Sequence, residues 1–164
     1  MRSATPAHKP QELERKRQMS ETTLRRSEAR EHAFLAAFSA TFQPDDPQEA
    51  LSAHTENSEA VLDAFSRRLL DDLLAHREEI DAIITAHLKG WTLARLPRVS
   101  LTAMRIALAE MLYGEEKKPG VAINEAVELV KKYGADNDHQ FVNGLLGSVA
   151  REQEADPAAE NAPC

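Results

Sequence analysis

Histidines and acidic residues are the side chains of this sequence best suited to catalysis or metal binding, but their spacing supports neither. The six histidines are scattered singly, and no Cys/His set, HExxH motif or P-loop is present. The acidic pairs Asp45-Asp46, Asp71-Asp72 and Glu78-Glu79 are adjacent in the chain. Adjacent residues of a helix point in different directions, so such a pair cannot share one substrate. We predict that the protein is not an enzyme and binds no metal or cofactor.

Two asparagines interrupt the apolar pattern of INEAVELVKKYGADNDHQFVNGLLG, residues 123–147. Asn124 and Asn143 would each place an amide in an apolar stripe, and buried amides need hydrogen-bond partners. Each is therefore either a structural tie or a group that faces a ligand. No catalytic residue surrounds them, so we expect a tie between the last two helices. Asn143→Leu should then cost about 1–3 kcal/mol of stability.

The composition indicates one globular domain. The chain has 164 residues, of which 29% are charged and 5% aromatic, so the core must consist mainly of Leu, Ile, Val and Ala. No apolar run approaches the roughly 18 residues needed to span a bilayer, and the N-terminus lacks a secretory signal. The only cysteine, Cys164, excludes an intramolecular disulfide. We expect a cytoplasmic protein.

The charge is unevenly distributed along the chain. Residues 1–30 hold eight Lys or Arg against four Glu, a net charge of +4, although the whole chain carries −7. The remainder therefore carries −11. A basic arm on an acidic body predicts that any polyanion is bound by the arm. The alternative is a solvated tail without a binding role.

Apolar residues recur with a period of 3.6, and no segment alternates as a strand would, so the sequence predicts an all-α fold of six to seven helices. Helices are expected over residues 20–42, 48–54, 59–74, 78–88, 100–113, 119–133 and 138–152. The helical domain then spans residues 20–152, between a flexible basic tail (1–19) and a flexible C-terminal tail (153–164). Ser100 is expected to cap one helix and Gly90 to end another. Asn137 and Gln140 are expected to form a capping box.

The second half of the chain resembles the signature of the NusB family of bacterial transcription antitermination factors. The matching segments are Arg105–Leu108 with Glu110 and Met111, Ile123–Leu129, and Phe141–Gly144 with Leu146. Residues Glu28–Phe38 are similar to the first helix of the family. The resemblance covers about residues 25–150, and residues 45–90 share only the helical pattern.

The resemblance implies an all-α fold of two packed helical subdomains without catalysis. It also implies binding of boxA RNA from ribosomal RNA operons, together with NusE, a protein of the small ribosomal subunit. This assembly acts on RNA polymerase with other Nus factors. Some members of the family form homodimers.

The family pattern places RNA contacts at two points of this chain. The basic first helix contributes Arg25, Arg26 and Arg30, of which Arg26 and Arg30 share a helix face. The second set is Phe38, Asn137, Gln140 and Phe141. The alternatives to RNA binding are that the arginines only supply solubilising charge and that Phe38 and Phe141 pack in the core. We expect Arg26→Ala with Arg30→Ala to lower RNA affinity and leave the melting temperature unchanged.

Several positions depart from the family pattern. Ser27 and Glu28 interrupt the basic run, Phe38 replaces a frequent tyrosine, and Gln140 stands where lysine is common. Ser100 replaces an acidic residue at a helix start that the resemblance assigns to the protein partner. Leu101, Met104 and Tyr133 complete the expected partner-binding set. Because of these departures, a NusB-like bundle that has lost boxA binding remains the alternative function.

A third possibility comes from the NusB-like domains that precede some RNA cytosine methyltransferases. The sequence has no βαβ nucleotide-binding pattern, so we expect no methyltransferase domain in this chain.

Overall fold

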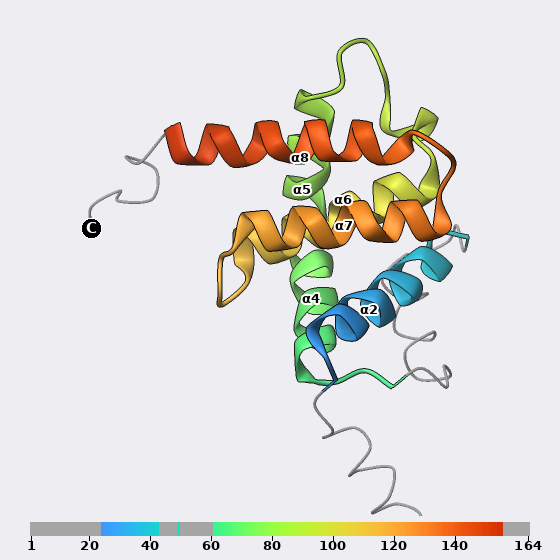
Figure 1. Ribbon diagram of the computed structural model, residues 1–164, viewed down its shortest axis with the longest axis vertical. Coiled ribbons are helices and arrows are strands. Elements are labelled where there is room, and N and C mark those ends of the chain that lie inside the picture. The colour runs from blue at the N-terminus through green and yellow to red at the C-terminus, as the bar shows by residue number, and fades with distance from the viewer. Residues whose placement is uncertain (1–23, 43–48, 50–60, 156–164) are drawn as a thin grey trace, which may run out of the picture.

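The computed structural model describes residues 24–42, 49 and 61–155, and Figure 1 shows the arrangement of its helices. The buried hydrophobic residues of these helices form one core cluster. The elements are α2 (Arg26–Ala40), α4 (Ala64–Ala75), α5 (Arg77–Ala86), the short 3₁₀ helix η2 (Leu93–Arg95), α6 (Arg98–Tyr113), α7 (Pro119–Tyr133) and α8 (Asp138–Ala155). The predicted all-α class is confirmed, since the described residues contain no strand. None of these helices has the length and apolar character needed to cross a membrane.

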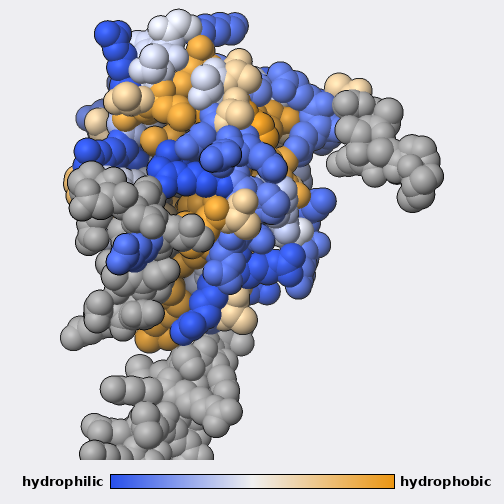
Figure 2. Space-filling model, turned by 180° about the vertical axis from the view of Figure 1, so that it is seen from behind, coloured by the Kyte–Doolittle hydropathy of each residue, from blue (hydrophilic) through white to orange (hydrophobic). Residues whose placement is uncertain are grey.

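Helix α6 lies at the centre of the fold and packs against α2, α4, α5, α7 and α8. From Thr102 to Met111 every residue of α6 except Arg105 is buried, as expected for a helix that has neighbours on nearly all sides. Helices α7 and α8 run antiparallel across one face, and α2 lies beside α7 (Figure 1). Seen from behind, hydrophobic side chains reach a largely hydrophilic surface in several separate areas (Figure 2).

Small residues allow α2 to approach its neighbours closely. Its buried face consists of Phe34, Arg30 and a series of alanines, namely Ala29, Ala33, Ala36, Ala37 and Ala40. An alanine face brings two helix backbones nearer than larger side chains would allow. Phe34 is fully buried and supplies most of the apolar volume of this contact.

One buried carboxylate fixes the starts of two helices, and both starts differ from the sequence prediction. The Asp63 carboxylate accepts hydrogen bonds from the Ser66 backbone N–H at 2.8 Å and from the Leu24 N–H at 3.0 Å. It therefore caps α4 and also binds Leu24, two residues before the start of α2. Burial acts to raise the pKa of Asp63, but these hydrogen bonds outweigh it and the pKa is lowered. Accordingly α4 begins at Ala64 rather than 59, and α2 at Arg26 rather than 20.

The other predicted helix ends also need correction. Helix α6 begins at Arg98, because Pro97 precedes it with a fixed φ, so Ser100 is buried inside the helix and does not cap it. Asn137 has φ 75°, which takes it out of the extended conformation of a capping-box residue.

The predicted ends of two further helices also differ. Gly90 has φ 80° but lies beyond the end of α5 at Ala86. Helix α8 continues to Ala155, past the predicted tail boundary at 152. The expected helix over 48–54 lies outside the described residues apart from Glu49, which is helical.

Asn124 and Asn143 do not tie the last two helices together, so the expectation of a buried amide seam is wrong. Both side chains are exposed. The 3.6-residue period turns Ala122, Ala126 and Leu129 of α7 toward the core, and Asn124 away from it. On α8 the inward residues are Val142, Leu145, Leu146 and Val149. The stability cost expected for Asn143→Leu therefore no longer applies.

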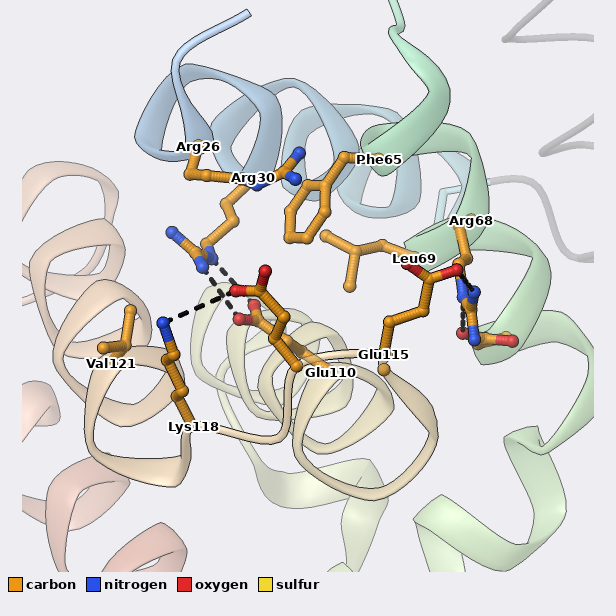
Figure 3. Close-up of a pocket in the computed structure, with 12 residues that line it drawn as sticks. Arg26, Arg30, Phe65, Arg68, Leu69, Glu110, Glu115, Lys118 and Val121 are labelled. Atoms are coloured by element: carbon orange, nitrogen blue, oxygen red, sulfur yellow. Dashed lines mark hydrogen bonds and ion pairs between the residues drawn. The ribbon is translucent and has the colours of Figure 1, made fainter.

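The strongest polar tie within the fold joins α2 to α6. The Arg30 guanidinium donates to both oxygens of Glu110, Nε to Oε1 at 2.7 Å and Nη2 to Oε2 at 2.8 Å (Figure 3). Arg30 is 8% exposed and Glu110 4% exposed, so the pair is shielded from water. Glu125 of α7 lies 3.8 Å from Nη1 of Arg30. Burial acts to lower the pKa of Arg30, but the hydrogen bonds to Glu110 and the two carboxylate charges raise it, so the arginine stays charged.

We expect Arg30→Ala to lower the free energy of unfolding by about 3–5 kcal/mol, because the substitution leaves the Glu110 charge buried without a partner. Urea unfolding followed by circular dichroism measures this loss. Arg25→Ala serves as the matched control, since Arg25 is exposed and should unfold like the unchanged protein. The double variant Arg30→Met with Glu110→Leu should recover much of the lost stability. Equal midpoints for Arg30→Ala and Arg25→Ala would show that the ion pair does not hold the fold together.

Candidate nucleic-acid interface

The three arginines expected to bind RNA have different environments. Arg25 and Arg26 are exposed, and within the described residues neither forms an ion pair with a carboxylate. The Arg26 guanidinium lies 4.1 Å from the centre of the Phe65 ring, a cation–π contact that orients it. Arg30 is buried, which contradicts the expectation that its replacement would leave the melting temperature unchanged. Arg25 and Arg26 are therefore the cations at this end of α2 that can meet a phosphate.

Phe65 of α4 lies against Arg26 and Arg30, although its position in the apolar pattern indicates only a core residue. Its ring is half-buried, with Arg26 over it and the Arg30 guanidinium 5.3 Å from its centre. The apolar period of α4 correctly predicts that Phe65 packs inward. It cannot show that two arginines of another helix lie against the ring.

A second group of exposed residues lies at the elbow between α7 and α8, which we define as residues 133–141. Phe141 is 42% exposed and Tyr133 38% exposed, although both are large and apolar. Asn137 and Gln140 lie between them in the chain and are also exposed. Exposed aromatic rings can stack on bases, and exposed amide groups can form hydrogen bonds with the base edges.

Helix α2 holds this elbow in position. The Tyr133 hydroxyl and the Lys132 ammonium both donate to Oε1 of Glu31, and the Tyr133 ring stacks on Phe34 with 5.5 Å between centroids. The hydrogen bonds from Lys132 and Tyr133 lower the pKa of Glu31, so its carboxylate is charged near neutral pH. The end of α7 is thereby fixed against the middle of α2.

Phe38 belongs to an aromatic column that continues from this contact. It stacks on Phe34 at 5.8 Å and meets the edge of Phe42 at 5.1 Å. Phe38 itself is half-buried, whereas Phe42 is 56% exposed and lies beneath the guanidinium of Arg98. The exposed aromatic surface at this end of α2 therefore comes more from Phe42 than from the predicted Phe38.

The predicted RNA-binding residues thus form two groups and not one cluster. Arg26 and Phe38 are twelve positions apart on α2, about 18 Å along the helix axis at 1.5 Å per residue. The arginines lie at the start of the helix, and the column that leads to the elbow lies in its second half. A bound strand would have to extend along α2 to contact both groups.

The expected partner-binding residues are only partly accessible. Ser100 is 1% exposed and Met104 is fully buried, so neither can touch a partner directly and the expectation is corrected for both. Their inward orientation follows from the central position of α6. Tyr133 is exposed, and Leu101 is half-buried at a surface hollow.

This hollow, which we call the partner hollow, lies between α2, α4, η2 and α6 and has a volume of about 420 Å³. Its wall is mainly apolar, and three arginines also line it: Arg77, Arg98 and Arg105. Arg105 donates two hydrogen bonds to Asp81, and Arg77 lies 3.9 Å from the same carboxylate. Burial and the nearby charge of Arg105 lower the pKa of Arg77. The hollow is therefore apolar with a surplus of positive charge.

Comparison with known proteins identifies the family. The model of the NusB family matches residues 27–151. A transcription antitermination protein NusB of Heliobacterium modesticaldum is 40% identical over 146 residues, which cover 84% of this chain and 70% of the relative. The NusB protein of Geobacillus kaustophilus is 39% identical over 126 residues, 77% of this chain and 95% of the relative.

Solved structures agree with these sequence matches. T. maritima NusB superposes with a TM-score of 0.69 at 31% identity, covering 80% of this chain and 94% of that one. A chain from a crystal structure of the antitermination factors NusB and NusE in complex with dsRNA gives a TM-score of 0.65 at 32% identity, covering 77% and 96%. The sequence and the fold lead to the same assignment: this chain belongs to the NusB family.

Proposed function

We propose that this chain is a transcription antitermination factor that binds boxA RNA of ribosomal RNA operons together with NusE. The observation that carries the proposal is the exposed pair Arg25 and Arg26 at the start of α2, which form no ion pair with the described residues, in a chain whose relatives are antitermination proteins. Single-stranded RNA is held by cations on its phosphates and by bases stacked on aromatic or guanidinium planes. Both kinds of group are exposed along one helix and the elbow beside it.

In the proposed complex the two groups have different tasks. Arg25 and Arg26 neutralise phosphates, and the basic tail over residues 1–19 adds further cations. Phe141 and Tyr133 offer faces on which bases can stack, while the amides of Asn137 and Gln140 offer donors and acceptors to base edges. No step of this function requires a catalytic group. The protein acts in the cytoplasm, where transcription occurs.

NusE fits the partner hollow. Protein partners commonly anchor apolar side chains in such hollows, and the three arginines favour acidic or carbonyl groups around the anchor. Leu101 lines the hollow and remains accessible for this contact. Tyr133 is exposed but does not line the hollow, and Ser100 and Met104 lie in the core. The assembly then joins RNA polymerase with other Nus factors, and a homodimer would compete for the same apolar surface.

Arg25→Ala with Arg26→Ala should weaken boxA binding and flatten its salt dependence. Each lost phosphate contact removes about 0.7 from the slope of log K against log salt for a single strand, so the pair removes about 1.4. Fluorescence anisotropy with a labelled boxA oligoribonucleotide and NusE at several salt concentrations measures both effects.

The matched control for this experiment is Arg95→Ala with Arg151→Ala. It removes the same charge from exposed arginines outside both groups. Equal affinities and slopes for the two double variants would refute the assignment of Arg25 and Arg26. If the unchanged protein binds boxA and a scrambled RNA equally, or binds neither, it is a NusB-like bundle without boxA binding.

Ala94→Glu should reduce NusE affinity by about tenfold or more, which corresponds to about 1.4 kcal/mol. Ala94 is exposed and lines the partner hollow, so the new side chain fills the hollow and neutralises an arginine. Ala86→Glu is the control, because Ala86 is exposed on α5 outside the hollow. Titration calorimetry with NusE measures the affinities, and an unchanged value for Ala94→Glu would move the interface elsewhere.

A further inference from the structure

A second cavity lies beside the arginines of α2, between the start of α2, α4, the end of α6 and the start of α7 (Figure 3). Its volume is about 220 Å³. Phe65 and Leu69 of α4 and Val121 of α7 form an apolar wall, and Val121 is 42% exposed. We call this space the α2–α4 cavity. It has room for a single ring system, and is smaller than typical sites for drug-sized ligands.

Four cations and four carboxylates line the α2–α4 cavity, and three of the cations form ion pairs with these carboxylates. Arg30 is bound to Glu110, and Lys118 lies 3.5 Å from Glu116. Arg68 contacts Glu115 and also Asp72, at 3.5 Å. Arg26 is the lining cation that forms no ion pair within the described part of the chain, although its charge helps to lower the pKa of the buried Asp63 carboxylate. A ligand that carries negative charge would meet Arg26 first.

The pairs at the outer rim of the cavity are weak. The side chains of Lys118, Glu115 and Glu116 are each more than half exposed, so water screens their ion pairs. An incoming anion can therefore replace Glu115 at Arg68 or Glu116 at Lys118 at little cost. The inner pair of Arg30 and Glu110 is buried and remains in place.

We propose that the α2–α4 cavity binds one nucleotide, with its base against the apolar wall and its phosphate on Arg26. A flat ring has apolar faces for Phe65, Leu69 and Val121, and stacking beside an aromatic ring and a guanidinium is the usual environment of an unpaired base. An inorganic phosphate would leave the apolar wall unused, and a purely apolar ligand would leave Arg26 unused. The cavity chemistry requires both parts in one ligand.

The nucleotide can belong to bound RNA or be free in solution. The RNA source rests on the proposed function, because Arg26 would then serve both the strand and the cavity. A base turned out of the strand at the start of α2 would enter the cavity while the rest continues along the helix. The experiment must therefore include both sources.

The decisive variant is Val121→Phe, which fills the cavity from its rim. Asn124→Phe is the matched control, since it places the same side chain one turn further along α7 at an exposed site outside the cavity. Phe65→Leu is a second variant that keeps an apolar side chain but removes the ring. Thermal melting by circular dichroism confirms that each variant folds.

In the RNA arm, each nucleotide of the boxA oligoribonucleotide is replaced in turn by an abasic one, and affinity is measured with NusE present. At one position, removal of the base should lower the RNA affinity of the unchanged protein and of Asn124→Phe about tenfold, as expected for one stacked base. The same removal should hardly change the RNA affinity of Val121→Phe and Phe65→Leu.

In the free arm, AMP, GMP, CMP and UMP are titrated against the methyl NMR signals of Leu69 and Val121, with ribose 5-phosphate as the probe without a base. Shifts caused by a nucleotide but not by ribose 5-phosphate, and absent for a protein with Phe65→Leu, support the cavity with a free ligand.

The two arms separate the possible results. Suppose that the protein binds boxA RNA, but Val121→Phe removes the dependence on a base at no position, and no nucleotide causes specific NMR shifts. This result overturns the nucleotide site and leaves the proposed function intact. Absence of boxA binding by the unchanged protein contradicts the proposed function, and the free arm then decides the cavity by itself.

Discussion

The buried ion pair between Arg30 and Glu110 is the interaction on which the other parts of the molecule depend. It fixes the first described helix to the central one through two buried side chains, and Glu125 brings a third helix to the same point. A buried charge that loses its partner is costly, so this contact restricts α2 to one position more strictly than apolar packing alone. That position places Arg26 over Phe65 and brings Glu31 to the elbow between α7 and α8.

Helix α2 combines two roles because arginines of one run face different surroundings. Arg30 points toward α6 and is part of the fold, whereas Arg25 and Arg26 are exposed at the start of the helix and form no ion pair within the part of the chain that the structure describes. Reading all three as one basic patch overestimates the number of cations available to a phosphate. At the elbow, Tyr133 likewise has a structural and an exposed part. Its hydroxyl donates a hydrogen bond to Glu31, while the exposed part of its ring remains accessible.

The elements that periodicity controls could be predicted from the sequence, and the contacts between distant residues could not. The apolar period gives the helices and most of their buried faces. It does not give the start of α4, because Asp63 sets that start by accepting a hydrogen bond from the Ser66 N–H, a local cap that the apolar period does not carry. It also does not show that the same carboxylate binds the Leu24 N–H, 39 residues earlier. It also misses the role of Arg30, whose partner is 80 residues away. Asn143 was assigned to the apolar stripe, but one position on a helix is a rotation of about 100°, enough to turn the amide outward.

We propose that the exposed Arg25 and Arg26 of α2 bind the phosphates of boxA RNA in company with NusE. The most direct test is the affinity of the unchanged protein with NusE for boxA and for a scrambled oligoribonucleotide across a range of salt concentrations. We expect tighter binding of boxA and a slope of log K against log salt of about −1.4 or steeper, from at least two phosphate contacts. A slope near zero, or equal affinity for the two RNAs, would contradict it.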